Sequence, residues 1–145
     1  MDWLTAIIVA HAVSTMMMTG LIWFVQLVHY PLMGHVGESG FADYEAQHTR
    51  RTTWIVAPLM LVELLSASAL LVCINSDSGR MLAGVGFAFV VLNWVSTAFI
   101  QVPCHRKLTE GFDANAVDRL VATNWIRTVA WTLRAVIVVA IWYVI

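Results

Sequence analysis

The sequence contains few charged residues for its length. Asp, Glu, Lys and Arg make up 12% of its 145 residues, whereas hydrophobic residues make up 60% and the mean hydropathy is +0.78. A soluble domain carries roughly 25% charged residues, so this composition excludes that class and is typical of an integral membrane protein. The formal net charge is only -1, and this near balance gives no indication of a nucleic-acid partner.

Cysteine is also scarce. The only two, Cys73 and Cys104, fall at the ends of the second and third apolar stretches, which lie on opposite membrane faces if the stretches span the bilayer in turn. A disulfide between them within one subunit is therefore excluded, because hydrocarbon about 30 Å thick separates them.

Two long stretches contain no Asp, Glu, Lys or Arg at all. They cover residues 3–37 and 81–105, and each exceeds the ~20 residues that a membrane-spanning helix needs. Two further stretches, 52–75 and 120–145, contain one and two charged residues. We therefore predict an all-α, four-helix membrane bundle that forms a single transmembrane domain over residues 1–145, with spans at about 4–28, 52–75, 81–103 and 120–144.

The basic residues of the loops predict the orientation of the bundle. Five belong to the first and third loops and one to the second: Arg50, Arg51, Arg106, Lys107 and Arg119 against Arg80. Because basic loops stay in the cytoplasm, we expect both termini on the non-cytoplasmic side. The predicted location is the bacterial inner membrane, with the lipid bilayer as a partner.

The second span is preceded by a helical segment outside the membrane. The Tyr-Pro pair at 30–31 is expected to end the first helix, and three glycines make the following loop flexible. After this loop, no residue interrupts a helix until Pro58. We therefore predict a cytoplasmic helical extension at about 41–51, which carries Glu45 and His48.

Polar residues recur at helical spacing within the apolar stretches. The stripes are Glu45, His48 and Glu63 in the second helix, Asn93, Thr97, Gln101 and His105 in the third, and Asn124, Arg127, Trp131 and Arg134 in the fourth. Steps of three, four and 18 residues place each set on one face of its helix. The stripes therefore predict a bundle with a polar interior.

Four side chains near the cytoplasmic boundary form a candidate metal site. They are His29, Glu45, His48 and His105. A Glu-x-x-His sequence places a carboxylate and an imidazole on one helical face, as in carboxylate-bridged metal bundles. The mixed nitrogen and oxygen set suits iron, copper, manganese or zinc. Haem is the alternative cofactor, with His29 and either His48 or His105 as axial ligands.

The charges within the spans need partners, because an unpaired charge in hydrocarbon is costly. Glu63 is expected at a depth similar to that of Arg127, which predicts a structural ion pair between them. Arg134 is then left without a carboxylate and is expected to bind the polar part of a ligand. We predict that the substrate contacts Gln101, Asn124, Arg127 and Arg134.

Three short segments resemble small four-helix membrane proteins of the anthrone-oxygenase-like family. They are Val28-His29-Tyr30-Pro31, the segment from Val102 to Leu108, and Asn124-Trp125-Ile126-Arg127-Thr128. The resemblance implies a membrane oxidoreductase or oxygenase for a lipophilic substrate, aromatic or quinone-like, and leaves its cofactor open. With the candidate ligands above, it predicts a metal-dependent enzyme.

Other functions remain open. One is a haem-binding or non-catalytic accessory subunit of a membrane complex, and another is a small proton or ion conductor that uses Glu63 and the histidines. Gly79, Gly84 and Gly86 are small residues of the kind found where membrane helices touch. Homo-oligomers or a larger membrane complex are therefore compatible with the sequence.

Overall fold

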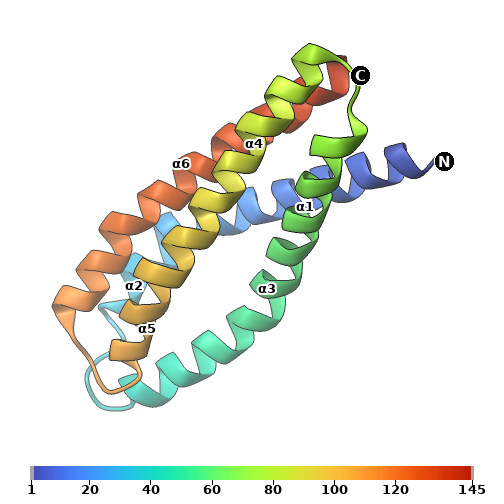
Figure 1. The fold of residues 1–145 in the computed structure, drawn as a ribbon. Coiled ribbons are helices and arrows are strands. Elements are labelled where there is room, and N and C mark those ends of the chain that lie inside the picture. Colours follow the sequence, from blue (N-terminus) through green and yellow to red (C-terminus); the bar gives the residue numbers. More distant parts are fainter. Residues whose placement is uncertain (1, 145) are drawn as a thin grey trace.

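The computed structural model describes residues 2–144, which form four long helical rods. The first rod is α1 (Trp3–Phe24), η1 (Val25–His29) and α2 (Tyr30–Met33), the second is α3 (Phe41–Cys73), the third is α4 (Asp77–Ser96), η2 (Thr97–Gln101) and α5 (Val102–Leu108), and the fourth is α6 (Ala114–Val144). Successive rods run in opposite directions. Both termini therefore lie at one end, and loops 34–40 and 109–113 lie at the other, the two-loop end (Figure 1).

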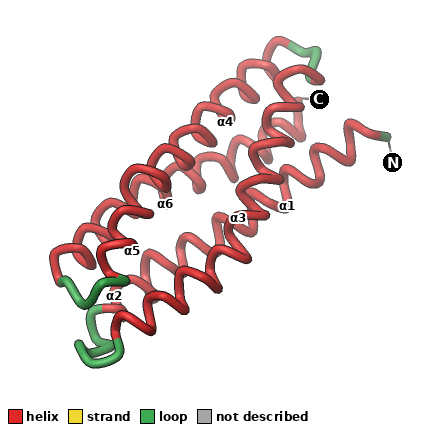
Figure 2. The backbone as a smooth tube through the Cα atoms, turned by 60° about the horizontal axis from the view of Figure 1, so that its bottom comes forward, coloured by secondary structure: helices red, strands yellow, loops and turns green. Residues whose placement is uncertain are grey.

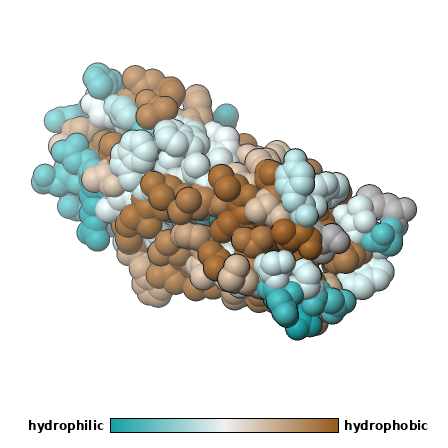
Figure 3. All heavy atoms as spheres, turned by 90° about the horizontal axis from the view of Figure 1, so that it is seen from above, coloured by the Kyte–Doolittle hydropathy of each residue, from teal (hydrophilic) through white to brown (hydrophobic). Residues whose placement is uncertain are grey.

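By length and composition, each rod is able to cross a membrane. The rods measure 31, 33, 32 and 31 residues, so the prediction of four apolar helices is confirmed. Figure 3 shows a largely hydrophobic area between hydrophilic groups at the two ends of the molecule. This distribution is expected where lipid tails surround the middle of a bundle.

The first rod continues through its proline, so the prediction that the first helix ends at 30–31 is wrong. A π-helical turn precedes the proline of this rod and also that of the third rod. The N–H of Tyr30 bonds to the carbonyl of Val25, and that of Val102 bonds to Thr97, five residues back in each case. Both prolines then stand in the first turn of a new α-helical segment, where the missing N–H is tolerated.

The second rod begins at Phe41, where the helical extension was expected to start. The preceding Gly40 has a φ of 88°, a conformation that glycine adopts without strain. α3 then runs through Pro58 to Cys73 without a break. On this single helix Glu45 and Glu63 both face the interior, with exposures of 0% and 1%.

The rods pack in a square. α1 and α4 each contact both α3 and α6, so α3 and α6 stand diagonally opposite one another (Figure 2). Apolar side chains fill the interior in two clusters, one including Met18, Met60 and Trp131 and the other including Ile8 and Leu70. The two cysteines are free, as the sequence predicts.

The loop before α6 is fixed by Asp113. Its carboxylate lies 2.5 Å from Lys107 Nζ and accepts a 2.9 Å hydrogen bond from the backbone N–H of Ala116. The bond to Lys107, followed by the one to Ala116, lowers the pKa of the Asp113 carboxyl. These contacts connect the end of α5 to the first turn of α6.

Two of the three glycines near the start of the third rod serve packing within the subunit. A Cβ atom at Gly79 would lie 2.5 Å from Ile74, and one at Gly86 would lie 3.4 Å from Ile137. Both glycines are buried, whereas Gly84 is exposed. Of these three positions, only Gly84 is exposed for contact with a second subunit.

Candidate functional site: a cavity near the two-loop end

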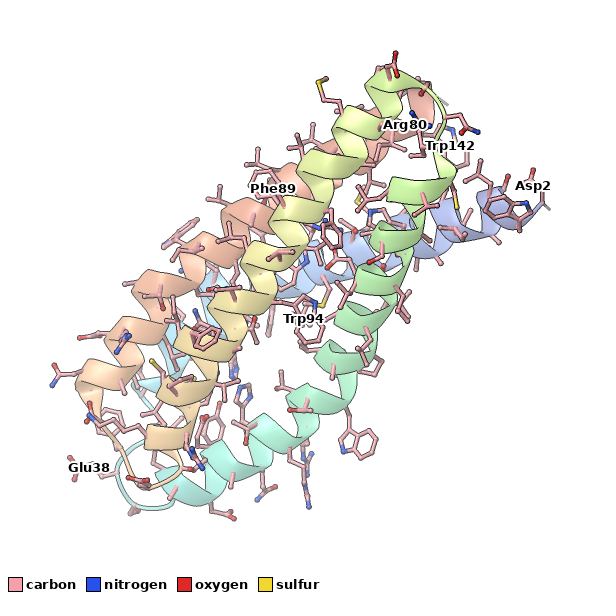
Figure 4. All side chains as sticks on the ribbon, in the orientation of Figure 1. Asp2, Glu38, Arg80, Phe89, Trp94 and Trp142 are labelled. Carbon is pink, nitrogen blue, oxygen red and sulfur yellow. The ribbon has the colours of Figure 1, made fainter. Side chains whose placement is uncertain are left out.

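A cavity with a volume of about 560 Å³ lies between α3 and the rod formed by α4, η2 and α5. Its apolar walls include Met18, Leu21, Ile22, Val56, Ala57, Met60 and Trp94. Figure 4 shows Trp94 projecting from α4 toward α3. Cavities of ~300–1,000 Å³ with mostly apolar walls are typical of small-molecule sites, so this one has room for a lipophilic ligand.

Polar side chains gather on one part of the cavity wall. They come from all four rods and include Tyr30, His48, Gln101, His105 and Arg127. The π-helical turns contribute to this arrangement, because Tyr30 directly follows η1 and Gln101 ends η2. The cavity therefore suits a molecule with an apolar body and a polar head group.

Arg127 is a buried cation, and its hydrogen-bond partners in the structure are neutral side chains. Its guanidinium donates hydrogen bonds to Asn124 Oδ1 at 2.7 and 3.0 Å and to Thr97 Oγ1 at 3.2 Å. A longer bond of 3.4 Å reaches the Tyr30 hydroxyl. Within residues 2–144 no Asp or Glu forms an ion pair with Arg127, which is only 6% exposed. Its positive charge is therefore available to an oxygen of a ligand in the cavity.

His105 lies between a carboxylate and a phenol. Its Nδ1 is 2.5 Å from Glu45 Oε1, and its Nε2 is 2.9 Å from the Tyr30 hydroxyl. Because the same hydroxyl contacts Arg127, a continuous hydrogen-bonded series runs from Glu45 to Arg127. The other Glu45 oxygen is buried and has no partner among the described residues.

The four predicted metal ligands are neighbours in the structure. The rings of His29 and His48 stack with their centroids 4.2 Å apart, and the centroid of His105 is 5.5 Å from that of His48. Glu45 joins this group through its bond to His105. The sequence therefore identified four residues from three rods that come together.

These neighbours nevertheless do not fit a metal or a haem as they are placed. Both ring nitrogens of His105 and one oxygen of Glu45 are already hydrogen bonded. Over residues 2–144, no group of three or more His, Cys, Asp or Glu side chains is arranged to hold a metal ion. The stacked rings of His29 and His48 leave no room for a porphyrin between them, so axial ligation by this pair requires the rings to separate.

A second polar cluster lies deeper in the bundle, and it corrects the predicted ion pair. Glu63 Oε1 is 3.0 Å from Arg134 Nε, so Glu63 pairs with Arg134 and not with Arg127. Glu63 also accepts hydrogen bonds from Thr15 Oγ1 at 2.8 Å and from the indole N–H of Trp131 at 3.0 Å. The prediction that Arg134 lacks a carboxylate is therefore wrong.

The position of each residue along its helix explains the correction. α6 begins at Ala114 and not at the predicted span boundary near residue 120. Glu63 stands 22 residues after the start of α3, Arg134 stands 20 after the start of α6, and Arg127 stands only 13 after it. When two helices start at the same end of a bundle, residues that are the same number of positions from the two starts lie at the same depth. Arg134 therefore meets Glu63 across the diagonal of the bundle.

Arg134 has further partners. It donates to the carbonyl of Gly86, to Thr15 Oγ1 at 3.3 Å, and it lies 3.5 Å from His11 Nε2. His11 Nδ1 is in turn 2.9 Å from the Ser66 hydroxyl. This buried network is separate from the cavity wall and is a structural element of the interior.

The predicted substrate-binding residues thus fall into three groups. Gln101 and Arg127 line the cavity, Asn124 holds Arg127, and Arg134 belongs to the deeper network. Sequence reasoning missed Tyr30, which contacts both His105 and Arg127. Its only signal was its place beside His29, because the adjacent proline was interpreted as a helix end.

Comparisons with known proteins identify no relative. No protein-family model, curated protein or solved structure matches the chain. The resemblance to the anthrone-oxygenase-like family therefore stays a prediction from three short segments.

Proposed function

We propose that this protein is a membrane-embedded oxidoreductase or oxygenase that binds a lipophilic phenol or quinone-like molecule in the cavity. The observation that carries the proposal is Arg127, a buried guanidinium on the wall of a mostly apolar cavity, which no carboxylate among residues 2–144 neutralises. A phenolate or quinone oxygen is the complementary group, because it is negative or strongly polarised while its ring is apolar.

The remaining polar wall supports the same chemistry. A phenol that loses its proton becomes an electron-rich phenolate, the form that an acceptor such as dioxygen oxidises more readily. Arg127 favours this charged form by electrostatic attraction. The proton that leaves goes to the oxygen of the Tyr30 hydroxyl, while this hydroxyl passes its own proton to Nε2 of His105, whose ring is oriented by Glu45.

We place the polar part of the cavity toward the cytoplasm, in a bacterial inner membrane. The excess of basic residues in the first and third loops supports this orientation. The cavity lies near the two-loop end, where these loops are found. A substrate dissolved in the bilayer then reaches the apolar wall, and its head group lies near the cytoplasmic boundary.

Binding of an alkylated naphthol to the purified protein in lipid nanodiscs tests the proposal. Arg127→Gln should weaken binding of the naphthol roughly 10-fold or more, because a hydrogen bond to a charged group contributes about 1.5–3 kcal/mol. Arg119→Gln, at an exposed position in the first turns of α6, is the matched control and should bind like wild type.

The methyl ether of the same naphthol checks that Arg127→Gln remains folded, since this neutral probe should bind the variant and the wild type alike. Oxygen consumption with the bound naphthol then tests the redox step. The proposal is overturned if wild-type nanodiscs take up no more naphthol than empty ones, or if Arg127→Gln binds it as tightly as wild type.

A further inference from the structure

Three of the residues that line the cavity are also exposed on the outer surface of the bundle. They are Thr53 of α3 and Val102 and Arg106 of α5. A side chain that borders both the cavity and the surface marks the place where the two meet. The cavity therefore has a mouth, which we define by these three residues, and it lies between α3 and the third rod.

The packing of the backbone is open at the same place. α3 contacts α4 and α5, the two segments on either side of η2 in the third rod. Between the described residues 41–73 and 97–101, however, no Cα atom of α3 comes within 8 Å of one in η2. Thr97 and Gln101, the first and last residues of η2, line the cavity at this level. The mouth therefore adjoins a gap in the packing of α3 against the third rod.

The outer surface beside the mouth is apolar. Trp54, next to Thr53, is 77% exposed, and Phe99, three residues before Val102, is 73% exposed. Thr53 and Val102 also belong to the predicted spans 52–75 and 81–103. In a bilayer, side chains of this kind at this level contact lipid tails. The mouth is therefore suited to an apolar group that passes between the cavity and the lipid.

The main polar groups of the cavity come from the two rods that do not border the mouth. Arg127 belongs to α6, which stands diagonally opposite α3, and Tyr30 belongs to the first rod. Both residues line the cavity and are bonded to each other at 3.4 Å. A molecule whose polar group contacts Arg127 therefore directs its other end toward the gap between α3 and the third rod.

We propose that the substrate is a phenol or quinone-like ring with a linear apolar tail, and that the tail passes through the mouth into the bilayer while the ring contacts Arg127. This inference rests on the proposed function and narrows its substrate class. An enclosed cavity of about 560 Å³ limits the length of its ligand, whereas a mouth open to lipid accepts a tail longer than the cavity.

Two probes with the same ring and different tails test the inference. They are para-cresol, which has a single methyl group, and para-hexadecylphenol, whose ring and extended tail together are longer than the cavity. Dissociation constants are measured in nanodiscs and expressed as mole fractions in the lipid. Wild-type protein should bind the two probes within about 3-fold of one another, because a tail that stays in lipid has the same surroundings before and after binding.

Tryptophan substitutions at the mouth should separate the two probes. Thr53→Trp and Val102→Trp should each weaken para-hexadecylphenol about 10-fold or more, because the indole and the tail compete for the same space. Both variants should bind para-cresol like wild type, which also shows that they remain folded. Ile55→Trp is the matched control, because Ile55 is 55% exposed on α3 and does not line the cavity.

The outcomes distinguish this inference from the function on which it depends. If neither the naphthol nor para-cresol binds wild-type protein, the proposed function itself fails. If para-cresol binds and para-hexadecylphenol does not, the cavity is closed to a tail, and only the inference is wrong. Equal losses of both probes in the two tryptophan variants, or no loss of either, would also contradict it while the cavity remains a binding site.

Discussion

The two buried arginines of this protein, Arg127 and Arg134, have different kinds of partner. Glu63 and Arg134 neutralise one another and are almost fully enclosed, with 1% exposure each. Additional donors from Thr15 and Trp131 satisfy the carboxylate, as a buried pair requires if it is not to be costly. Within the described part of the chain, Arg127 has only neutral partners, and it borders the cavity. One arginine is therefore structural, and the other is available to a ligand.

Removal of the Glu63 charge should destabilise the bundle. Glu63→Gln leaves Arg134 as a buried cation without a counter-charge, which costs about 3–5 kcal/mol. The free energy of unfolding in mixed micelles, measured with increasing denaturing detergent, should fall by this amount. Glu110→Gln, at an exposed loop position, is the control and should change it little.

The double variant Glu63→Leu with Arg134→Met tests the reason for this loss. It removes both charges together, so no uncompensated charge remains, and it should recover most of the stability that Glu63→Gln loses. A double variant less stable than Glu63→Gln would show that the charge balance is not what the pair contributes.

Among the helices, the two π-helical turns determine which side chains reach the cavity. One lies in the first rod and one in the third, and in each rod a single residue separates the end of the turn from the proline. A π-helical turn contains about one residue more than an α-helical turn. The extra residue changes the direction in which the following side chains point. Tyr30 directly follows η1, and Gln101 is the last residue of η2. Each rod therefore continues as a helix through its proline, while Tyr30 and Gln101 come to line the cavity.

Deletion of one residue from a π-helical turn should be tolerated better than deletion from an α-helix. Without Leu27, η1 closes into an α-helical turn, and the segments on either side keep their orientation. The loss of unfolding free energy should stay within about 2 kcal/mol. Deletion of Met17 in α1 is the matched control, because both side chains are exposed, at 60% and 53%. Deletion of Met17 rotates the part of α1 before it by about 100° relative to the rest of the rod. The core contacts of that part are then lost, and cooperative unfolding should be lost with them.

At the scale of the whole molecule, the bundle is asymmetric along its axis. The cavity lies near the two-loop end, whereas the cluster of Ile8, Leu70, Ile74, Ala83 and Ile141 closes the end that holds the termini. The outer surface carries many exposed apolar side chains, among them Trp54, Phe99 and Tyr143. Such a surface suits a bilayer, and the cavity between α3 and α5 lies toward one end of the bundle.

The proposed orientation predicts which loops a membrane-impermeant thiol reagent reaches. In a background of Cys73→Ser and Cys104→Ser, Ser78→Cys should be labelled in intact spheroplasts, because it lies at the end that holds the termini. Ser39→Cys, in the loop 34–40, should be labelled only after the membrane is opened. The reverse pattern would place the polar part of the cavity outside the cell.

The sequence by itself determined four apolar helices, the start of the second at residue 41, and the inward direction of the polar stripes, because each follows from local composition and helical periodicity. It also identified His29, Glu45, His48 and His105 as neighbours. It did not reveal the continuation of the first helix through Pro31, since this depends on a π-helical turn that periodicity does not indicate.

Only the tertiary structure decided which arginine takes Glu63. Arg127 and Arg134 lie on the same face of one helix, two turns apart, so both are compatible with the polar stripe of α6. Which arginine pairs with Glu63 depends on where α3 and α6 begin and on their diagonal placement in the bundle. The spacing of polar residues along a single helix indicates neither. Because Arg134 takes the carboxylate, Arg127 retains its charge beside the cavity, and the site of the proposed ligand follows from that packing.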